Sequence, residues 1–187
     1  MPVEYRVSDE SRIEAVRIAE LRLSDTSRHL SRHRPTARNL TSQVRGALGE
    51  LYACQWLSDN DLEVETGFRE DLVSSCDIDV SGRRIEVMTA KISDREKTQF
   101  CVPPGKLQAA RNRGAWGYLF VGTDDSRDCQ VVTIQGGIEL HRIEAFPRAM
   151  TYVSRPEYAV ENHVIPHASL LTPDDVLAML KSPAPRS

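Results

Sequence analysis

The chain has 187 residues, of which 40% are hydrophobic and 27% are charged, and its net charge at pH 7 is −3. This composition is typical of a soluble globular protein with one sizeable core. No apolar run approaches the ~20 residues that span a bilayer, and the polar N-terminus does not resemble a secretion signal. We therefore expect a single cytoplasmic domain, residues 1–187, that is not associated with a membrane.

The four cysteines are far apart and form no C-x-x-C pair, which favours a reduced protein over a zinc site. The net negative charge argues against a protein that coats nucleic acid indiscriminately. Residues 26–49 and 105–123, however, contain no acidic residue and several basic ones. Such patches can mark a surface that faces phosphates, although a solvated helix face is the alternative. The candidate nucleic-acid contacts in these segments are Arg34, Arg38, Arg45, Lys106, Arg111 and Arg113.

The N-terminal third of the sequence predicts two helices. The first covers about residues 9–30, with an apolar stripe that includes Ile13, Val16 and Leu23. The segment 31–39 interrupts it, and a second helix begins at Thr41 or Ser42 and extends to about residue 59. The second helix is apolar nearly all round and should be buried.

The middle of the chain has the alternation typical of strands. We expect a strand at 62–68, a hairpin formed by 76–81 and 84–90 around Ser81-Gly82, and a further strand at 98–102. A short helix ending at Gly114 then leads to a continuous apolar strand at 115–122. Strand, helix and buried strand over 98–122 predict a β-α-β crossover.

The C-terminal part is more mixed. The sequence predicts strands at 129–134 and 163–166 and a helix at 172–181, which Thr172 caps and Pro173 begins, whereas 138–150 is ambiguous. Together the elements indicate an α/β fold with a central mixed sheet flanked by helices. Within it, residues 1–40 form an N-terminal helical extension, 41–135 the core, and 136–187 C-terminal strand and helix elements.

In the hairpin "CDIDVSGRRIEVMTAK", the position of the turn decides which face of the sheet each side chain occupies. A two-residue turn at Ser81-Gly82 places Asp77 opposite Glu86. Side chains alternate along a strand, so one face carries Asp77, Asp79, Arg84, Glu86 and Met88, and the other carries Ile78, Val80, Ile85 and Val87. Two carboxylates about 5 Å apart repel unless a cation neutralises them. Arg84 could do so, and so could Mg²⁺, which prefers oxygen ligands.

A third acid lies on the second helix. Glu50 shares a flank with small and apolar residues of a helix that should be buried, where a carboxylate is rarely left unpaired. Gly46 and Gly49 each cost about 1 kcal/mol relative to alanine within a helix. Such glycines usually allow another element to approach closely, and a helix that presses Glu50 onto the acidic face of the sheet would explain both features.

These residues resemble the PD-(D/E)XK nuclease superfamily, which has the restriction-endonuclease-like fold. The resemblance covers roughly residues 41–122 and consists of "GALGE" on the helix, an aspartate on one strand and "IEVMT" on the next. It implies that Asp77 and Glu86 bind Mg²⁺ or Mn²⁺, with the main-chain carbonyl of Val87 as a further ligand and Asp79 as the alternative to Asp77. Glu50 would hold a metal-bound water or a second metal. The implied activity is metal-assisted cleavage of double-stranded DNA, often by a homodimer.

Met88 stands where the family has a catalytic lysine, and methionine can neither donate a proton nor offset charge. Lys91 would need a bulge to reach the acidic face, and Arg84 lies on that face but stays protonated. Three interpretations remain. Another residue does the work of the lysine; the chain is a degenerate member that binds without cutting; or the lysine was deliberately replaced. Retention of Glu50, Asp77 and Glu86 favours a real nuclease site without its lysine.

The leading hypothesis is therefore a metal-dependent DNA endonuclease related to restriction or defence, inactive in this chain if nothing replaces the lysine. The first alternative is a catalytically degenerate module of the same fold that acts as a DNA-binding or regulatory subunit. The second is an unrelated α/β protein whose acidic residues only decorate a sheet.

Overall fold

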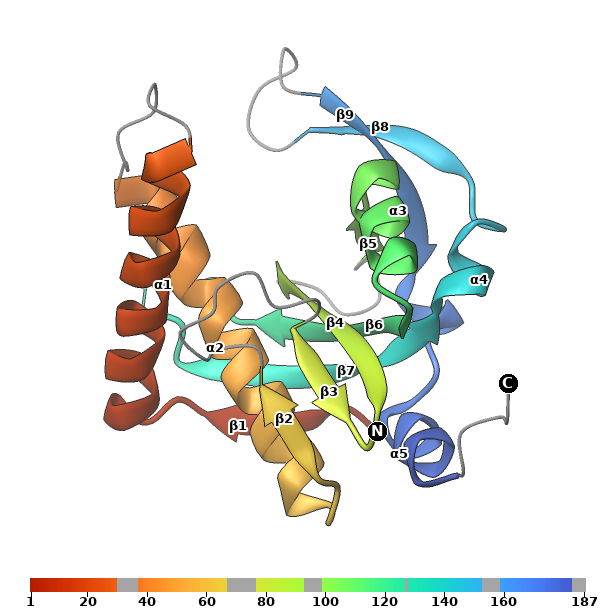
Figure 1. Cartoon of the computed structure of the whole chain (residues 1–187), viewed down its shortest axis with the longest axis horizontal. Coiled ribbons are helices and arrows are strands. Elements are labelled where there is room, and N and C mark those ends of the chain that lie inside the picture. The colour runs from red at the N-terminus through yellow and green to blue at the C-terminus, as the bar shows by residue number, and fades with distance from the viewer. Residues whose placement is uncertain (30–36, 67–76, 93–98, 127, 153–158, 183–187) are drawn as a thin grey trace.

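The computed structural model describes all residues except 30–36, 67–76, 93–98, 127, 153–158 and 183–187 (Figure 1). Its larger sheet has six strands in the order β1-β7-β6-β4-β3-β2. In that order the strands are Val3–Arg6, Val131–Glu139, Ala115–Thr123, Arg83–Lys91, Ile78–Val80 and Val64–Thr66. The β4–β6 pair is parallel and the other pairs are antiparallel, so the sheet is mixed.

A second sheet has three antiparallel strands in the order β5-β9-β8, namely Gln99–Val102, Ala159–Pro166 and Arg148–Tyr152. The helices are α1 (Asp9–His29), α2 (Ala37–Asp59), α3 (Pro104–Asn112), α4 (Leu140–Ile143) and α5 (Pro173–Lys181), with a 3-10 turn, η2, at His167–Ser169. The expected class, an α/β fold with a mixed sheet flanked by helices, is confirmed. Among the described helices, none is long and apolar enough to cross a membrane.

The large sheet separates two apolar clusters. On one face α1, α2 and α5 pack against the sheet, with Trp56, Leu57 and Val176 among the buried residues. On the other face α3, α4 and the second sheet cover Tyr118 and Phe120 of β6. In Figure 1 the C-terminal end of α1 and the β8–β9 pair stand apart on opposite sides of the sheet's β4–β6 centre.

The β3–β4 hairpin has the expected register, with Ile78 opposite Ile85 and Val80 opposite Arg83. Ser81 and Gly82 both have positive φ, at 51° and 80°, as a tight two-residue turn requires. Ile78, Val80 and Ile85 are fully buried in the α2 cluster, whereas Met88 packs against the α3 cluster. The alternation of the two faces was therefore predicted correctly for these residues.

The expected crossover is wrong in one respect, because β5 does not belong to the large sheet. β5 pairs with β9 in the second sheet, and it is β4 that pairs in parallel with β6 after the chain has passed through β5 and α3. The sequence of a short apolar strand does not indicate which strand it pairs with, and β9 lies far from β5 along the chain. The helix and the central strand stand where they were expected.

The N-terminal segment contributes more than a helix. β1 pairs with β7 at the edge of the large sheet, and neither β1 nor β8 was expected. The predicted stripe of α1 is wrong at Ile13, which is 71% exposed, whereas Val16 and Leu23 are half-buried. The small residues Ala15 and Ala19 are buried. α2 begins at Ala37, earlier than expected.

Candidate functional site

Three carboxylates from different parts of the chain share one electrostatic environment. Glu50 comes from the middle of α2, Asp77 stands directly before β3, and Glu86 lies on β4. Glu50 and Glu86 are 6% and 7% exposed. The charge of Asp77 raises the pKa of both glutamates, so the three groups are close enough to interact.

Gly49 explains how α2 reaches the sheet. A Cβ atom at this position would stand 2.0 Å from the Thr89 Oγ1 atom of β4, whereas nothing lies within 4 Å of a Cβ at Gly46. Only glycine allows α2 to lie this close to β4. Gly49 therefore brings α2 close to β4, as expected, whereas the close approach expected of Gly46 is wrong. The face is also not the expected one, because α2 packs on the side of Ile85 and Val87 and not on the acidic side, which carries Met88.

Asp77 is oriented by the main chain of the neighbouring strand. The Val87 amide donates a 2.8 Å hydrogen bond to Asp77 Oδ2. Burial raises the pKa of Asp77, and the Val87 amide and the charges of Arg22, Lys106 and Arg113 oppose this rise. Within the part of the chain that the structure describes, Asp77 Oδ1 has no hydrogen-bond donor.

Glu86 is held in a similar way by the end of α3. Arg113 donates to Glu86 Oε1 from Nη2 at 2.6 Å and from Nε at 3.0 Å. Burial raises the pKa of Glu86 most, then the charge of Asp77, while Arg113 lowers it. Among the described residues no donor contacts Glu86 Oε2. Arg113 was expected to contact nucleic acid, and here it orients a carboxylate.

Glu50 differs because an arginine takes both of its oxygens. Arg22 of α1 donates to Oε1 at 2.9 Å and to Oε2 at 2.5 Å. Burial nevertheless raises the pKa of Glu50 to about 7. The sequence reading missed Arg22, although the signal was present. Arg22 lies at the helical spacing of the buried residues Ala15, Ile18 and Ala19. A charged side chain on the buried face of a helix needs an oppositely charged partner.

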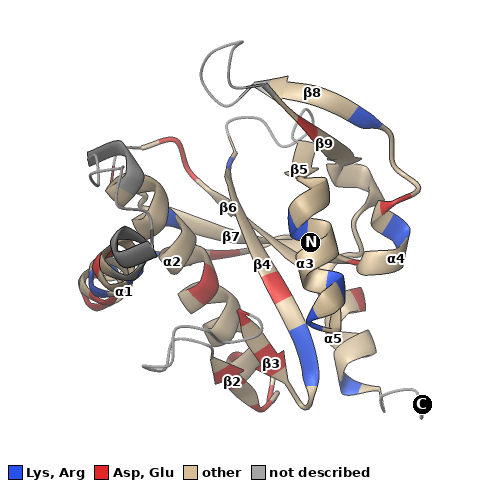
Figure 2. Ribbon diagram, turned by 45° about the horizontal axis from the view of Figure 1, so that its top comes forward, with Lys and Arg blue, Asp and Glu red and all other residues tan. Residues whose placement is uncertain are grey.

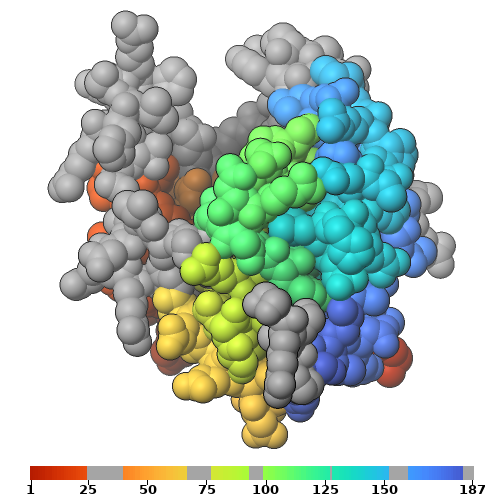
Figure 3. Space-filling model, turned by 45° about the vertical axis from the view of Figure 1, so that its right-hand side comes forward, coloured from red at the N-terminus to blue at the C-terminus, as the bar shows by residue number. Residues whose placement is uncertain are grey.

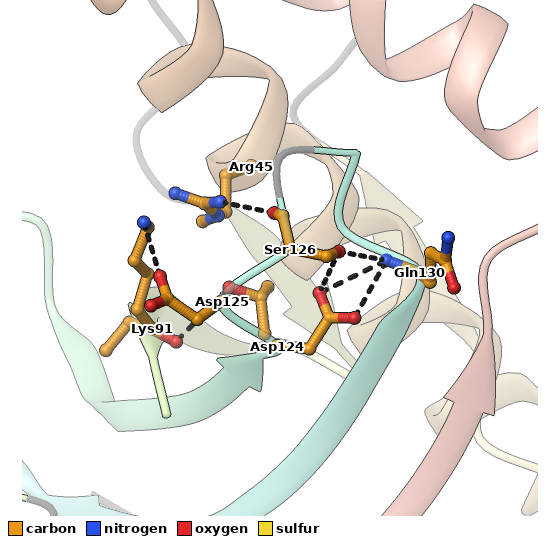
Figure 4. A network of polar contacts seen from close by, with 8 residues as sticks. Arg45, Lys91, Asp124, Asp125, Ser126 and Gln130 are labelled. Carbon is orange, nitrogen blue, oxygen red and sulfur yellow. Dashed lines mark hydrogen bonds and ion pairs between the residues drawn. The ribbon is translucent and has the colours of Figure 1, made fainter. Parts of the chain in front are cut away.

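Two of the residues considered as lysine substitutes are engaged elsewhere. Lys91 forms a 2.6 Å ion pair with Asp125 at the far end of β4. That pair belongs to a network that also includes Asp124, Ser126 and Gln130 (Figure 4). Arg84 donates a 2.6 Å hydrogen bond to the Arg113 carbonyl. Asp79, the alternative to Asp77, accepts from the Gly82 amide and so supports the hairpin turn.

The candidate phosphate contacts are scattered. Arg45 is half-buried and donates to the Ser126 carbonyl, which places it in the same network (Figure 4). Arg111 forms a 2.7 Å ion pair with Glu144, and Lys106 is exposed on α3. Arg38 lies in α2, and Arg34 lies outside the described residues. Figure 2 shows basic segments on α3 beside the acidic segment of β4.

The donor set fits a hard divalent cation. Within the described ranges, no group of three or more His, Cys, Asp or Glu side chains is arranged to hold a metal ion. Mg²⁺, however, is usually bound by one or two carboxylates together with water. Asp77 and Glu86 provide two carboxylates, each fixed through one oxygen with the other left over, whereas Glu50 is occupied by Arg22.

Comparisons with models of protein families, with curated proteins and with solved structures found no match for this chain.

Proposed function

We propose that this chain is a metal-dependent endonuclease that hydrolyses phosphodiester bonds in double-stranded DNA, with a restriction-endonuclease-like core of the PD-(D/E)XK type. The observation that carries the proposal is the arrangement of Asp77 and Glu86. Each carboxylate is fixed by a hydrogen bond to one oxygen, at 2.8 Å from the Val87 amide and at 2.6 Å from Arg113, and keeps its other oxygen. Orientation by neighbouring groups is typical of carboxylates that bind metals.

Asp77 Oδ1 and Glu86 Oε2, with the Val87 carbonyl, would hold Mg²⁺ or Mn²⁺. A metal at these oxygens would polarise a phosphoryl oxygen and activate water. The protein's part is to hold both carboxylates in place and to oppose the rise in pKa that burial causes. Arg113 does this for Glu86, and the Val87 amide does it for Asp77, because each lowers the pKa of the group that it contacts.

Glu50 and Arg22 would act beside this pair. With both oxygens bound to Arg22, Glu50 is placed to fix the arginine at the edge of the site and, if the ion pair opens, to accept a hydrogen bond from water. The proposed partner is double-stranded DNA in the cytoplasm, bound by a homodimer, because cutting both strands requires two sites. Arg34, Arg38 and Lys106 remain candidates for phosphate contacts.

One observation favours the alternative of a catalytically degenerate DNA-binding or regulatory module. Arg22 and Arg113 already neutralise Glu50 and Glu86, so the buried charges are balanced by the protein itself. Such a cluster can persist as a structural element after catalysis has been lost.

Cleavage of supercoiled plasmid in Mg²⁺ or Mn²⁺ separates these functions. The chains to compare are the wild type, Met88→Lys, Glu86→Ala and the double variant Met88→Lys/Glu86→Ala. We expect metal-dependent nicking by the first two and none by the last two. If neither the wild type nor Met88→Lys cuts and neither binds Mn²⁺ by calorimetry, the proposed nuclease function is wrong. If both bind plasmid without cutting, the degenerate module is the better description.

A further inference from the structure

Lys106 stands in the first turn of α3 and shares a face of that helix with Arg113. The helix covers Pro104–Asn112 and Arg113 is its C-cap. The two basic residues are about two helical turns apart, a spacing that places side chains on the same side of a helix. Because Arg113 reaches Glu86 from this side, Lys106 also faces β4.

The direction of α3 brings Lys106 toward Met88. In Figures 1 and 2 α3 lies beside β4 and runs the opposite way, and in Figure 3 the atoms of α3 adjoin those of the β3–β4 hairpin. The hydrogen bond from Arg84 to the Arg113 carbonyl fixes the end of α3 at the start of β4. Two helical turns span roughly 10 Å, the length of about three strand residues. Counted from Arg84, that distance reaches Val87 and Met88.

Electrostatics agrees with this placement. The positive charge of Lys106 lowers the pKa of both Asp77 and Glu86. Arg22 and Arg113 are each in an ion pair with a carboxylate, whereas Lys106 is exposed and forms no ion pair within the described part of the chain. The Lys106 charge therefore acts on both carboxylates, although Lys106 is in an ion pair with neither of them.

We propose that Lys106 supplies, from helix α3, the positive charge that β4 lacks at Met88, and that it contacts the phosphate being cleaved. This inference rests on the proposed nuclease function. In the hydrolysis, the water oxygen bonds to phosphorus and the bond from phosphorus to one ester oxygen breaks. The attacking water loses a proton and the leaving oxygen gains one. Lys106 stays protonated and stabilises the negative charge that develops on the phosphoryl oxygens.

The test compares five chains: the wild type, Lys106→Met, Met88→Lys, Lys106→Met/Met88→Lys, and Lys181→Met as the matched control. Lys181 ends α5, which packs on the opposite face of the sheet. Two quantities are measured, namely the single-turnover rate of plasmid cleavage at saturating protein and the affinity for Mn²⁺ without DNA.

We expect Lys106→Met to lower the cleavage rate by about 10²- to 10³-fold, the usual effect of removing a group that stabilises transition-state charge. Adding Met88→Lys should restore at least about a tenth of the lost activity. Lys106→Met should also tighten Mn²⁺ binding by about three- to five-fold, because a repelling charge near Asp77 and Glu86 is gone. Lys181→Met should change neither quantity.

The inference is overturned if Lys106→Met cuts as fast as the wild type, or if Mn²⁺ affinity is unchanged. It is also overturned, while the proposed function stands, if the wild type is inert and the single variant Met88→Lys cuts. If no chain cuts, including Met88→Lys, the proposed nuclease function fails and the role of Lys106 fails with it.

Discussion

Glu50 and Glu86 are both buried glutamates in ion pairs with arginine, yet the two pairs are built differently. Arg22 comes from the neighbouring helix α1 and binds both oxygens of Glu50. Arg113 comes from the end of α3 and binds one oxygen of Glu86. A carboxylate that is hydrogen-bonded through one oxygen is oriented and can still bind a ligand with the other. A carboxylate that is hydrogen-bonded through both oxygens has neither oxygen left for a ligand. For the proposed nuclease, this difference predicts that a metal ion binds on the β3–β4 side and that Glu50 of α2 has a supporting role.

Removing each carboxylate in turn gives the largest expected difference. Glu86→Gln should lower the rate of plasmid cleavage by about 10²- to 10³-fold, the usual range for an electrostatic group at a reaction centre. Glu50→Gln should cost about ten-fold, the lower range for a group that acts through others. Both rates are measured in the same Mn²⁺ concentration. Equal losses would contradict the division of roles between the two glutamates.

Removing each arginine tests the same comparison through stability. Arg22→Gln leaves Glu50 buried without its partner and should lower the free energy of unfolding by about 3 kcal/mol. Arg113→Gln should cost only about 1 kcal/mol, because the Arg113 side chain is 35% exposed. Urea denaturation measures both values. The double variant Arg22→Gln/Glu50→Gln should recover most of the loss, and no recovery would show that Arg22 acts through packing alone.

The pH dependence of the free energy of unfolding tests the Glu50–Arg22 pair. Burial raises the pKa of Glu50 from 4.5 to about 7. Between these values the folded chain binds the proton more tightly than the unfolded chain does, so the free energy of unfolding falls as the pH rises from about 5 to about 7. The fall amounts to at most about 3 kcal/mol. Urea titrations in EDTA measure it, and in Glu50→Gln this part should vanish. Parallel curves for the two chains would contradict the raised pKa.

Substituting the two glycines of α2 should have the smallest effect on the free energy of unfolding, and the two substitutions control for each other. Gly49→Ala places a Cβ against Thr89 and should lower the free energy of unfolding by about 1–2 kcal/mol. Gly46→Ala meets nothing within 4 Å and should raise it by about 0.5–1 kcal/mol. Thermal and urea denaturation measure both. If Gly49→Ala stabilises the chain as Gly46→Ala does, α2 does not press against β4.

The local parts of this structure were predictable from sequence. The Ser81-Gly82 turn fixes the hairpin register, and the turn together with strand alternation puts Ile78 and Ile85 in the core. Thr172 caps the C-terminal helix as expected, within a capping box in which Thr172 and Asp175 exchange hydrogen bonds. In each case the residues that determine the local structure lie within a few positions of one another, so the local sequence is enough to predict it.

Long-range pairings were not predictable in this way. Nothing in "QFCV" indicates that β5 pairs with β9, and nothing in "VEYR" indicates that β1 joins β7. The three candidate carboxylates could be selected because their residue types and spacing are distinctive, but the arginines that pair with them could not all be predicted. Arg22 approaches Glu50 through the packing of α1 on α2, which depends on the whole core.

The pairing of β1 with β7 has a consequence for how the chain is made. Val3 lies opposite Ile134, so the first strand has no partner until most of the polypeptide has been synthesised. Contacts between such distant segments slow folding. A chain that lacks residues 1–7 would leave β7 as an open edge, and exposed edges invite association with other chains. We expect N-terminal truncation or a bulky N-terminal fusion to lower the yield of soluble protein more than a C-terminal fusion does.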